Sequence, residues 1–197
     1  MTGRIACLLL SAFIAAAADG CSASASPQFY TLDSTATPDR APAVHTTIMV
    51  GPVSIPASVD LPGFVVQVAT NRVEIEEFNR WAAPLNDIIA SAVAGDLAVL
   101  LGTPDVATAP LANFNPSYWV TIDVQRFEST RSEAALLEAV WAVRKSANGK
   151  IRSGRTLARE AVQGDNFDAL AAAHSRALAR MSSDIAAVIR AEAGVRP

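Results

Sequence analysis

The clearest structural pattern in the chain lies in residues 84 to 104, which read PLNDIIASAVAGDLAVLLGTP. Its apolar residues recur at spacings of three and four, which places them along one face of a helix. Pro84 suits a first helical turn, because its missing N–H would have no partner there. Gly102 is a natural residue just past a helix C-terminus, and Pro104 prevents continuation. The pattern predicts a helix with this apolar face: Leu85, Ile88, Ile89, Ala92, Val93, Leu97, Leu100 and Leu101.

A second amphipathic helix is predicted near the C-terminus. Asn166 is a favourable N-cap residue, and Gly194 and Pro197 end the pattern. Its apolar face carries one histidine, His174, which lies four residues from a leucine on either side. The other members of this face are Phe167, Leu170, Ala171, Leu178, Met181, Ile185, Val188 and Ile189.

The segments between these helices are typical of strands. Residues 118 to 125 alternate apolar and polar side chains with a period of two, and Asn148-Gly149 is the strongest hairpin signal in the chain. Two amphipathic helices must each bury one stripe against a sheet. We therefore expect an α/β domain with a mixed, largely antiparallel sheet of about five to seven strands. The predicted strands are 28–32, 46–50, 64–69, 73–76, 118–125, 134–145 and 150–162, and residues 104–109 could add a short edge strand.

Composition excludes several classes of protein. The 197 residues are 51% apolar and 18% charged, which is too hydrophobic for a disordered chain. The net charge is -3 and the pI about 5.4, so no nucleic-acid partner is expected. Two cysteines, Cys7 and Cys21, cannot form a disulfide framework or a four-cysteine zinc site.

The N-terminus has the pattern of an export signal. One basic residue, Arg4, precedes an uncharged apolar run over residues 5 to 18. That run would reach only about 21 Å as a helix, short of the roughly 30 Å hydrocarbon core, so it indicates a signal peptide over 1–20. Ala18-Asp19-Gly20-Cys21 resembles a bacterial lipobox with atypical residues at 18 and 19, which predicts lipidation of Cys21. Ordinary cleavage near Ala17 or Ala18 is the alternative.

If Cys21 is lipidated, the rest of the chain divides into a tether and a folded domain. Residues 21–27, rich in serine and alanine, then form a flexible tether, and 28–197 form a single globular domain. By resemblance to lipoprotein sorting rules, Ser22, which is not an aspartate, points to the periplasmic face of the outer membrane. Two or more acyl chains anchor a protein stably.

No catalytic or metal-binding motif is recognisable. The mature chain has two histidines, His45 and His174, and neither lies in a zinc, nucleophile-elbow or phosphate-binding motif. Glu74 and Glu76 share one face of a predicted strand, which we interpret as a solvated face rather than an acid–base pair. We therefore predict that the chain is not an enzyme and needs no metal or cofactor. A periplasmic hydrolase stays open, because triads assemble in space.

Two further groups have a structural and a functional interpretation. Basic residues crowd the predicted hairpin around Asn148-Gly149, either as charges that protect strand edges or as a site for an anionic head group or acidic partner. Trp81, Trp119 and Trp141 are expected to anchor the core, and the alternative is that an exposed subset of them contacts a partner. The basic residues are Arg144, Lys145, Lys150, Arg152, Arg155 and Arg159.

Several segments carry a family resemblance through their order and spacing. They are the lipobox-like cysteine followed by residues 29–32, residues 48–56 with Asp60, residues 71–85, residues 118–127 and residues 139–141. Together they resemble the paraquat-inducible protein C family, auxiliary lipoproteins of ABC-type lipid transport systems. The most specific part is the motif Arg80-Trp81-x-x-Pro84-Leu85, while Ser58 and Leu61 depart from the family pattern.

The resemblance implies a three-layer α/β domain at the inner leaflet of the outer membrane. It implies partners in an MCE-type system, namely an MCE-domain protein that bridges the periplasm and an inner-membrane permease with its ATPase, and it allows a homo-oligomeric ring. The chain itself would be a non-catalytic docking subunit. The motif at 80–85 is interpreted as structural, with Arg80 paired to Glu76 or Glu77, or as a partner contact. A carrier of a lipid or other hydrophobic ligand is the alternative function, and it would need an apolar cavity.

Overall fold

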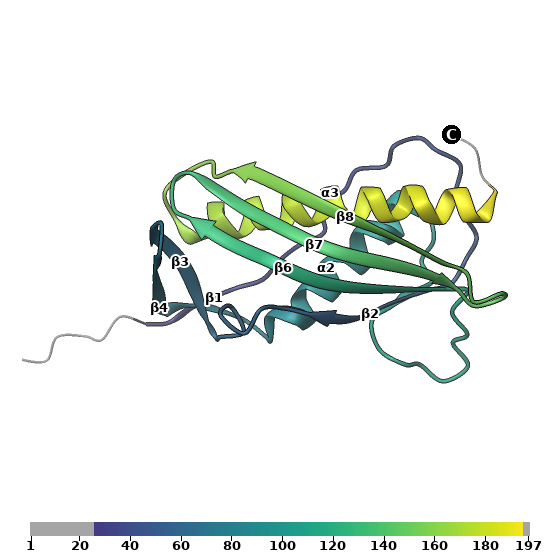
Figure 1. The fold of residues 1–197 in the computed structure, drawn as a ribbon, viewed down its shortest axis with the longest axis horizontal. Coiled ribbons are helices and arrows are strands. Elements are labelled where there is room, and N and C mark those ends of the chain that lie inside the picture. The colour runs from purple at the N-terminus through teal and green to yellow at the C-terminus, as the bar shows by residue number, and fades with distance from the viewer. Residues whose placement is uncertain (1–25, 195–197) are drawn as a thin grey trace, which may run out of the picture.

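The computed structural model describes residues 26 to 194. The predicted signal peptide and Cys21 lie outside these residues, as does most of the predicted tether. The described chain contains one sheet and two helices (Figure 1). The strands are β1 (Gln28–Tyr30), β2 (Ile48–Ser54), β3 (Gly63–Ala69), β4 (Arg72–Trp81), β5 (Val106–Ala107), β6 (Tyr118–Thr130), β7 (Ala134–Lys145) and β8 (Ile151–Ala161), and the helices are α2 (Leu85–Leu101) and α3 (Phe167–Ala193).

The sheet is mixed and centres on β6. The strand order is β1-β4-β3-β6-β2-β5, with β7 and β8 added beyond β6 through antiparallel pairs. The pairs β1–β4, β2–β5, β2–β6 and β3–β6 are parallel. The longest pairings, β6–β7 and β7–β8, are antiparallel, so the expected α/β class with a largely antiparallel sheet is confirmed. The sheet has one strand more than the seven predicted, namely β5, which lies inside the segment 104–109 where the sequence allowed a short edge strand.

Both helices have the predicted ends. Asn166 Oδ1 accepts a hydrogen bond from Ala169 N at 2.9 Å and so caps α3. Gly102 and Gly194 take left-handed conformations at the C-terminal ends of α2 and α3, where a side chain would be strained. Pro84 occupies the N-cap position of α2.

The arrangement of layers differs from the expected three. In the central strands one face is buried and the other exposed, as in β6, where Val120, Ile122 and Val124 are buried and Thr121 and Asp123 are exposed. Both helices lie on the buried face and contact each other (Figure 1). The sheet and the helix pair therefore form two layers, because both helices bury their apolar stripes on the same face of the sheet.

A long segment after β1, residues 31–47, crosses the helix pair, and we call it the strap. Val44 N donates to the carbonyl of Leu101 at 2.8 Å at the C-terminal end of α2. Earlier in the strap, Asp33 N donates to Ser175 Oγ on α3 at 3.1 Å. The strap is therefore tied to both helices and covers part of the side that faces away from the sheet.

The molecule is elongated, and its two ends are built from different elements. β1, the β3–β4 hairpin and the start of α3 lie at one end, where the described chain begins (Figure 1). The turn between β7 and β8 and the C-terminal end of α3 lie at the other. These ends differ in their distance along the chain from Cys21, which matters for how an anchored domain would be oriented.

Candidate functional site

The motif Arg80-Trp81-x-x-Pro84-Leu85 lies where β4 passes into α2. Trp81 is the last residue of β4, is buried, and donates its backbone N–H to Pro62 O at 2.8 Å. Its ring lies 3.9 Å from that of Phe64, centroid to centroid, and 6.1 Å from Phe127. Leu85 is buried as the first residue of the helix. Trp81 and Leu85 thus fix the angle between sheet and helix by burial.

Arg80 behaves differently from its neighbours in the motif. Its side chain is exposed, and among the described residues no ion pair joins it to Glu76 or Glu77. Glu76 instead accepts a hydrogen bond from Asn79 at 3.2 Å and lies 4.0 Å from Arg131. Arg80 is therefore the member of the motif whose charge faces solvent, and a role in partner contact stays a prediction.

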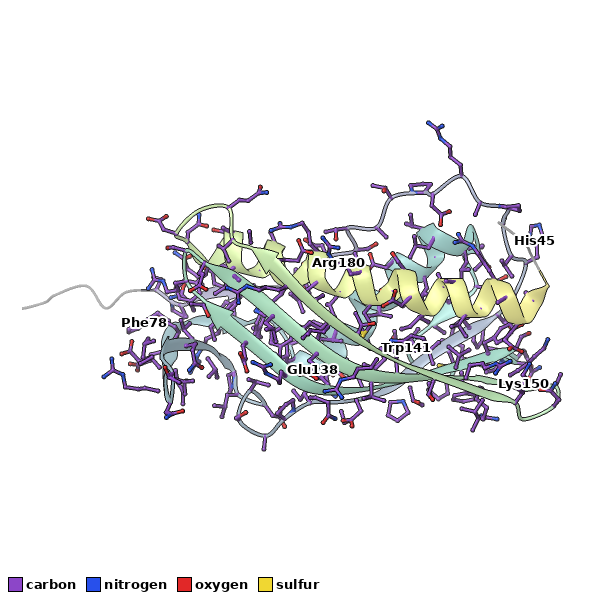
Figure 2. The ribbon with its side chains drawn as sticks, turned by 45° about the horizontal axis from the view of Figure 1, so that its top comes forward. His45, Phe78, Glu138, Trp141, Lys150 and Arg180 are labelled. Carbon is purple, nitrogen blue, oxygen red and sulfur yellow. The ribbon has the colours of Figure 1, made fainter. Side chains whose placement is uncertain are left out.

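The two histidines have opposite environments (Figure 2). His45 is exposed on the strap. His174 is completely buried on α3, stacks on Phe127 at 3.9 Å between ring centroids, and shares a 2.8 Å hydrogen bond with Ser129 Oγ through Nε2. The fold therefore assembles a serine–histidine pair from β6 and α3 that the sequence did not reveal, since 45 residues separate the two.

This pair is poorly suited to nucleophilic catalysis. Burial lowers the pKa of His174 from 6.5 to about 3, so the imidazole is a weak base at neutral pH. Its Nδ1 has no hydrogen-bond partner in the described part of the chain, whereas a catalytic histidine is oriented by a carboxylate at this atom. Ser129 is 2% exposed. The structure therefore brings a serine and a histidine together, as the hydrolase alternative requires, but their arrangement is not that of a catalytic pair.

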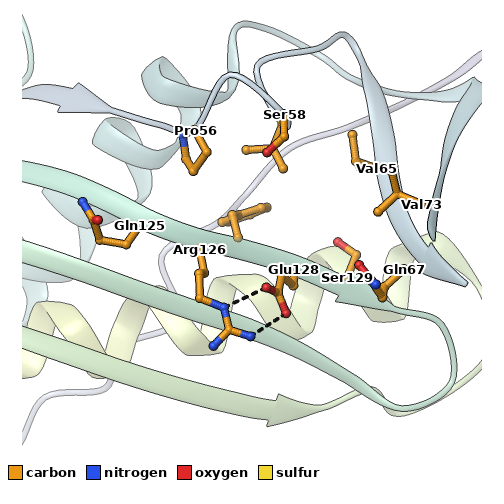
Figure 3. A pocket seen from close by; sticks show the side chains of 11 residues that line it. Pro56, Ser58, Val65, Gln67, Val73, Gln125, Arg126, Glu128 and Ser129 are labelled. Atoms are coloured by element: carbon orange, nitrogen blue, oxygen red, sulfur yellow. Dashed lines mark hydrogen bonds and ion pairs between the residues drawn. The ribbon is translucent and has the colours of Figure 1, made fainter. Parts of the chain in front are cut away.

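A pocket lies beside Ser129, between the places where β2 and β3 pair with the same edge of β6 (Figure 3). β2 pairs with β6 up to Asp123 and β3 pairs only at Ser129, so the edge of β6 between them has no strand partner on this side. The volume is about 170 Å³. The lining residues are Pro56, Ser58, Val59, Val65, Gln67, Val73, Gln125, Arg126, Phe127, Glu128 and Ser129.

The size of this pocket bears on the carrier alternative. Sites for drug-sized ligands usually measure about 300–1,000 Å³, and 170 Å³ has room for little more than one side chain. Larger hollows of about 400 and 420 Å³ are surface depressions with charged residues such as Arg176 and Lys145 in their walls. None of these described pockets is an enclosed apolar cavity for a whole lipid.

The basic residues of the β7–β8 hairpin are largely neutralised within the fold. Lys150 and Arg152 pair with Glu192 at 3.0 and 2.8 Å, and Arg155 pairs with Glu138. The hydrogen bonds from Arg152 and Lys150 hold the pKa of the Glu192 carboxyl below its usual range. The remaining members are also engaged, with Arg159 paired to Glu133, Arg144 over the Trp119 ring at 5.4 Å, and Lys145 Nζ donating to Glu192 O at 2.9 Å. This pattern favours the structural interpretation over an anion-binding site.

The other candidates from the sequence have simple environments. Glu74 is exposed and Glu76 is half-buried. Trp141 is buried and donates its indole N–H to Thr156 Oγ1 at 3.0 Å (Figure 2). Trp119 is half-buried. Trp81 and Trp141 are therefore core residues, as predicted, and Trp119 lies at the surface.

One buried polar site was missed in the sequence. Asp96, in the middle of α2, is completely buried, and its Oδ1 accepts hydrogen bonds from Thr35 N, Ala36 N and Ser34 Oγ at 2.9–3.0 Å. Its Oδ2 accepts one from Ser182 Oγ at 3.0 Å. A lone carboxylate inside an apolar helix was the available signal, because a buried charge must find partners.

Residues 26–194 contain no group of three or more His, Cys, Asp or Glu side chains placed to hold a metal ion. Neither of the helices in this range has the length and hydrophobicity needed to cross a membrane.

Comparison with solved structures identifies the fold. A crystal structure of an uncharacterized protein is 21% identical, covers 84% of this chain and 99% of its own, and has a TM-score of 0.69. A protein from Xanthomonas campestris, described by the family model DUF330, is 22% identical, covers 80% of this chain and 92% of its own, and has a TM-score of 0.64. No curated protein matches the chain.

Comparison with family models gives the class of protein. One model, described as the ABC-type transport auxiliary lipoprotein component, matches residues 30–186. The match runs from the last residue of β1 into the final turns of α3, so it includes the motif at 80–85 and the whole sheet apart from the first residues of β1. The resemblance noted from the sequence is thereby confirmed, and the chain belongs to the family of ABC-type transport auxiliary lipoprotein components.

Proposed function

We propose that this protein is a periplasmic lipoprotein anchored in the outer membrane through Cys21. It is a non-catalytic docking subunit of an MCE-type ABC system that moves lipid between membranes. Its partners are an MCE-domain protein that bridges the periplasm and the permease and ATPase of the same system. No step of the transport chemistry takes place in this subunit.

The observation that carries the proposal is the family match over residues 30–186, which follows an N-terminal apolar run over residues 5–18 and Cys21. An auxiliary lipoprotein needs an anchor and a folded domain, and the chain supplies the two in that order. Burial lowers the pKa of His174 to about 3, so this imidazole is a weak base at neutral pH, which favours a binding role over acid–base catalysis.

The elongated shape gives the anchored domain a direction. The described chain begins beside β1 and the β3–β4 hairpin (Figure 1), so an anchor at Cys21, only eight residues before Phe29, would hold this end nearest the membrane. The β7–β8 turn, the loop over residues 108–117 and the end of α3 then face the periplasm. The exposed Leu111 on this loop is available there for a partner.

Lipidation is tested in a Gram-negative host fed an alkyne-labelled palmitate. The wild-type chain should incorporate the label and fractionate with the outer membrane, whereas Cys21→Ser should do neither and become soluble. Ser22→Asp is the matched control, since it should keep the label but move to the inner membrane. A wild-type chain that stays unlabelled and soluble would contradict the anchor.

The transport role is tested by purification from native membranes. A C-terminally tagged chain should copurify with an MCE-domain protein, or with a permease and ATPase, after mild chemical cross-linking. The Cys21→Ser variant should recover less of the partner, because it is no longer concentrated at the membrane. Recovery of the labelled lipoprotein without any of these proteins would refute the docking role and leave the anchor standing.

A further inference from the structure

The outer face of the β1–β4–β3 corner carries exposed apolar side chains. Phe29 is 62% exposed, Ile75 61%, Val73 50% and Phe78 41%. We call these four residues the β4 patch. Figure 2 places Phe78 at the end of the molecule where the described chain begins. Exposed apolar clusters of this kind usually mark a surface that binds something.

The four side chains share a face because of pairing and a bulge. Tyr30 and Trp81 are register partners and point into the core, so their neighbours Phe29 and Arg80, also partners, point outward. Phe78 precedes Arg80 by two residues and therefore lies on the same face of the strand. Val65 is the register partner of Ile75 and is half-buried, and it follows Phe64, which stacks on Trp81 in the core, so strand alternation puts Val65 and Ile75 on the face opposite Phe64.

The bulge keeps Ile75 and Phe78 on one side although three positions separate them. Gly63 pairs with Arg80 and Val65 with Ile75, so one residue of β3 faces four of β4. A Cβ on Gly63 would lie 2.2 Å from Glu76 O. Only glycine admits this close approach, and the irregularity resets the alternation of β4.

A comparable exposed apolar region lies on the outer face of β7 and β8, where Leu157 and Val140 are exposed. There the apolar side chains lie among ion-paired residues, including Arg155 with Glu138 and Arg159 with Glu133. In the β4 patch Arg80 lies on the same face and has no ion-pair partner among the described residues, while the nearest ion pair, Arg126 with Glu128, lies across the pocket that Val73 lines. The β4 patch is thus apolar with a free cationic group beside it.

The length of chain before the patch indicates what covers it. Cys21 precedes Phe29 by eight residues, which can span at most about 29 Å when fully extended. If Cys21 is acylated, as the proposed function holds, Phe29 can never lie farther than this from the lipid head groups. The patch is therefore held at high effective concentration beside a bilayer.

We propose that the β4 patch binds the surface of a phospholipid bilayer. Phe29, Phe78, Ile75 and Val73 enter the boundary between head groups and acyl chains, and Arg80 contacts phosphate oxygens, as amphipathic surfaces of peripheral proteins do. The contact fixes the domain's orientation, so that the β7–β8 end points away from the membrane. The inference rests on the proposed anchor but adds a second, protein-mediated contact with the lipid.

The test uses single-cysteine labelling of the acylated, full chain. Residues 22–197 contain no cysteine and the sulfur of an acylated Cys21 is blocked, so Phe29→Cys or Ile75→Cys provides the only free thiol. Each variant is labelled with the environment-sensitive dye NBD and reconstituted into vesicles of phosphatidylethanolamine and phosphatidylglycerol. Ile151→Cys is the matched control, because Ile151 is 59% exposed at the far end of the sheet.

Labels at positions 29 and 75 should brighten about threefold or more and shift to shorter wavelength on reconstitution, while the label at 151 should not change. Quenching by lipids that carry a shallow spin label should follow the same pattern. Vesicle-bound protein whose three labels behave alike overturns the inference and leaves the anchor intact. Protein that does not float with the vesicles overturns the anchor and the inference with it.

A second copy of the chain is the competing occupant. The same labels are therefore followed in the soluble Cys21→Ser variant without vesicles, over a range of protein concentrations. The inference expects no change there. Brightening at positions 29 and 75 that grows with protein concentration would assign the patch to self-association and overturn the membrane contact.

Discussion

Two buried polar side chains, Asp96 on α2 and His174 on α3, show opposite ways of placing a titratable group in a core. Both are completely buried. Asp96 accepts four hydrogen bonds, three of them from the strap. His174 has one hydrogen-bond partner, Ser129, and its Nδ1 has none in the described chain. One site joins three segments by hydrogen bonds, and the other is filled mainly by stacking.

The two sites show under which conditions the fold tolerates a buried titratable side chain. A buried charge is stable only when donors replace its water, and the strap supplies such donors to Asp96. No group compensates a charge on His174, so its burial favours the neutral imidazole and lowers its pKa to about 3. Asp96 should therefore be essential to the packing of the strap, and His174 should be replaceable by an apolar side chain of similar volume.

The largest effect is expected for Asp96→Leu. The change leaves the backbone N–H groups of Thr35 and Ala36 without an acceptor, so the free energy of unfolding should fall by about 3–5 kcal/mol. Urea unfolding followed by circular dichroism measures it. Asp96→Asn is the control, because its Oδ1 can keep the strap donors and its Nδ2 can donate to Ser182 Oγ. A loss of more than about 2 kcal/mol in that control would show that charge, not hydrogen bonding, dominates.

A pH effect of intermediate size should come from His174. Because its pKa falls from 6.5 to about 3 on folding, the unfolded chain binds more protons between these values, and stability is lost as the pH falls from about 6.5. The loss between pH 7.5 and 5 should reach about 2 kcal/mol. His174→Leu should abolish this part of the pH dependence, and the exposed His45→Ala should retain it. An unchanged profile in His174→Leu would assign the dependence to other groups.

A smaller effect is expected for the double variant Ser129→Ala with His174→Leu at pH 7.5. Both partners of the hydrogen bond are then apolar, so the free energy of unfolding should change by less than about 1.5 kcal/mol. His174→Leu alone leaves the Ser129 hydroxyl unpaired and should be the less stable of the two. Thermal unfolding of both variants against wild type decides this. A double variant as unstable as Asp96→Leu would remove the distinction between the two sites.

The smallest effect is expected at the exposed end of the strap. Asp39 accepts two hydrogen bonds from Arg190 at 2.6 and 2.9 Å, which hold the pKa of the Asp39 carboxyl below its usual range. Its side chain is 43% exposed, so Asp39→Asn should cost only about 0.5–1 kcal/mol and less in high salt. Chemical denaturation with urea at two salt concentrations measures this. A cost close to that of Asp96→Leu would mean that this ion pair, and not Asp96, holds the strap.

Most elements of the fold could be predicted from local pattern. The helix ends at Gly102 and Gly194 and the cap at Asn166 follow from backbone chemistry that a few residues specify. The bounds of β4 and β6 could not be predicted, because both extend past their alternating cores into segments such as Glu77–Trp81 and Arg126–Thr130. There the irregular register at Gly63 and after Val124 breaks the period of two.

The candidate sites were predicted less well than the fold. Burial of Trp81 and Leu85 followed from their types, but the exposure of Arg80 depends on where Glu76 finds its other partners. The Ser129–His174 pair and the Asp96 cluster join residues separated by 45 and by about 60 positions. No local pattern encodes such pairs.

Composition and periods of two and 3.6 residues predict an export signal and a candidate anchor at Cys21, which lie outside the described residues, and they were sufficient to predict the two amphipathic helices and the strands. The folded arrangement was needed to show that both helices cover one face, that the strap is tied to Asp96, and that the β4 patch forms one surface. Those features depend on strand order and register, which bring distant residues together, and hydrogen bonds and apolar contacts act over a few ångströms in space and not along the chain.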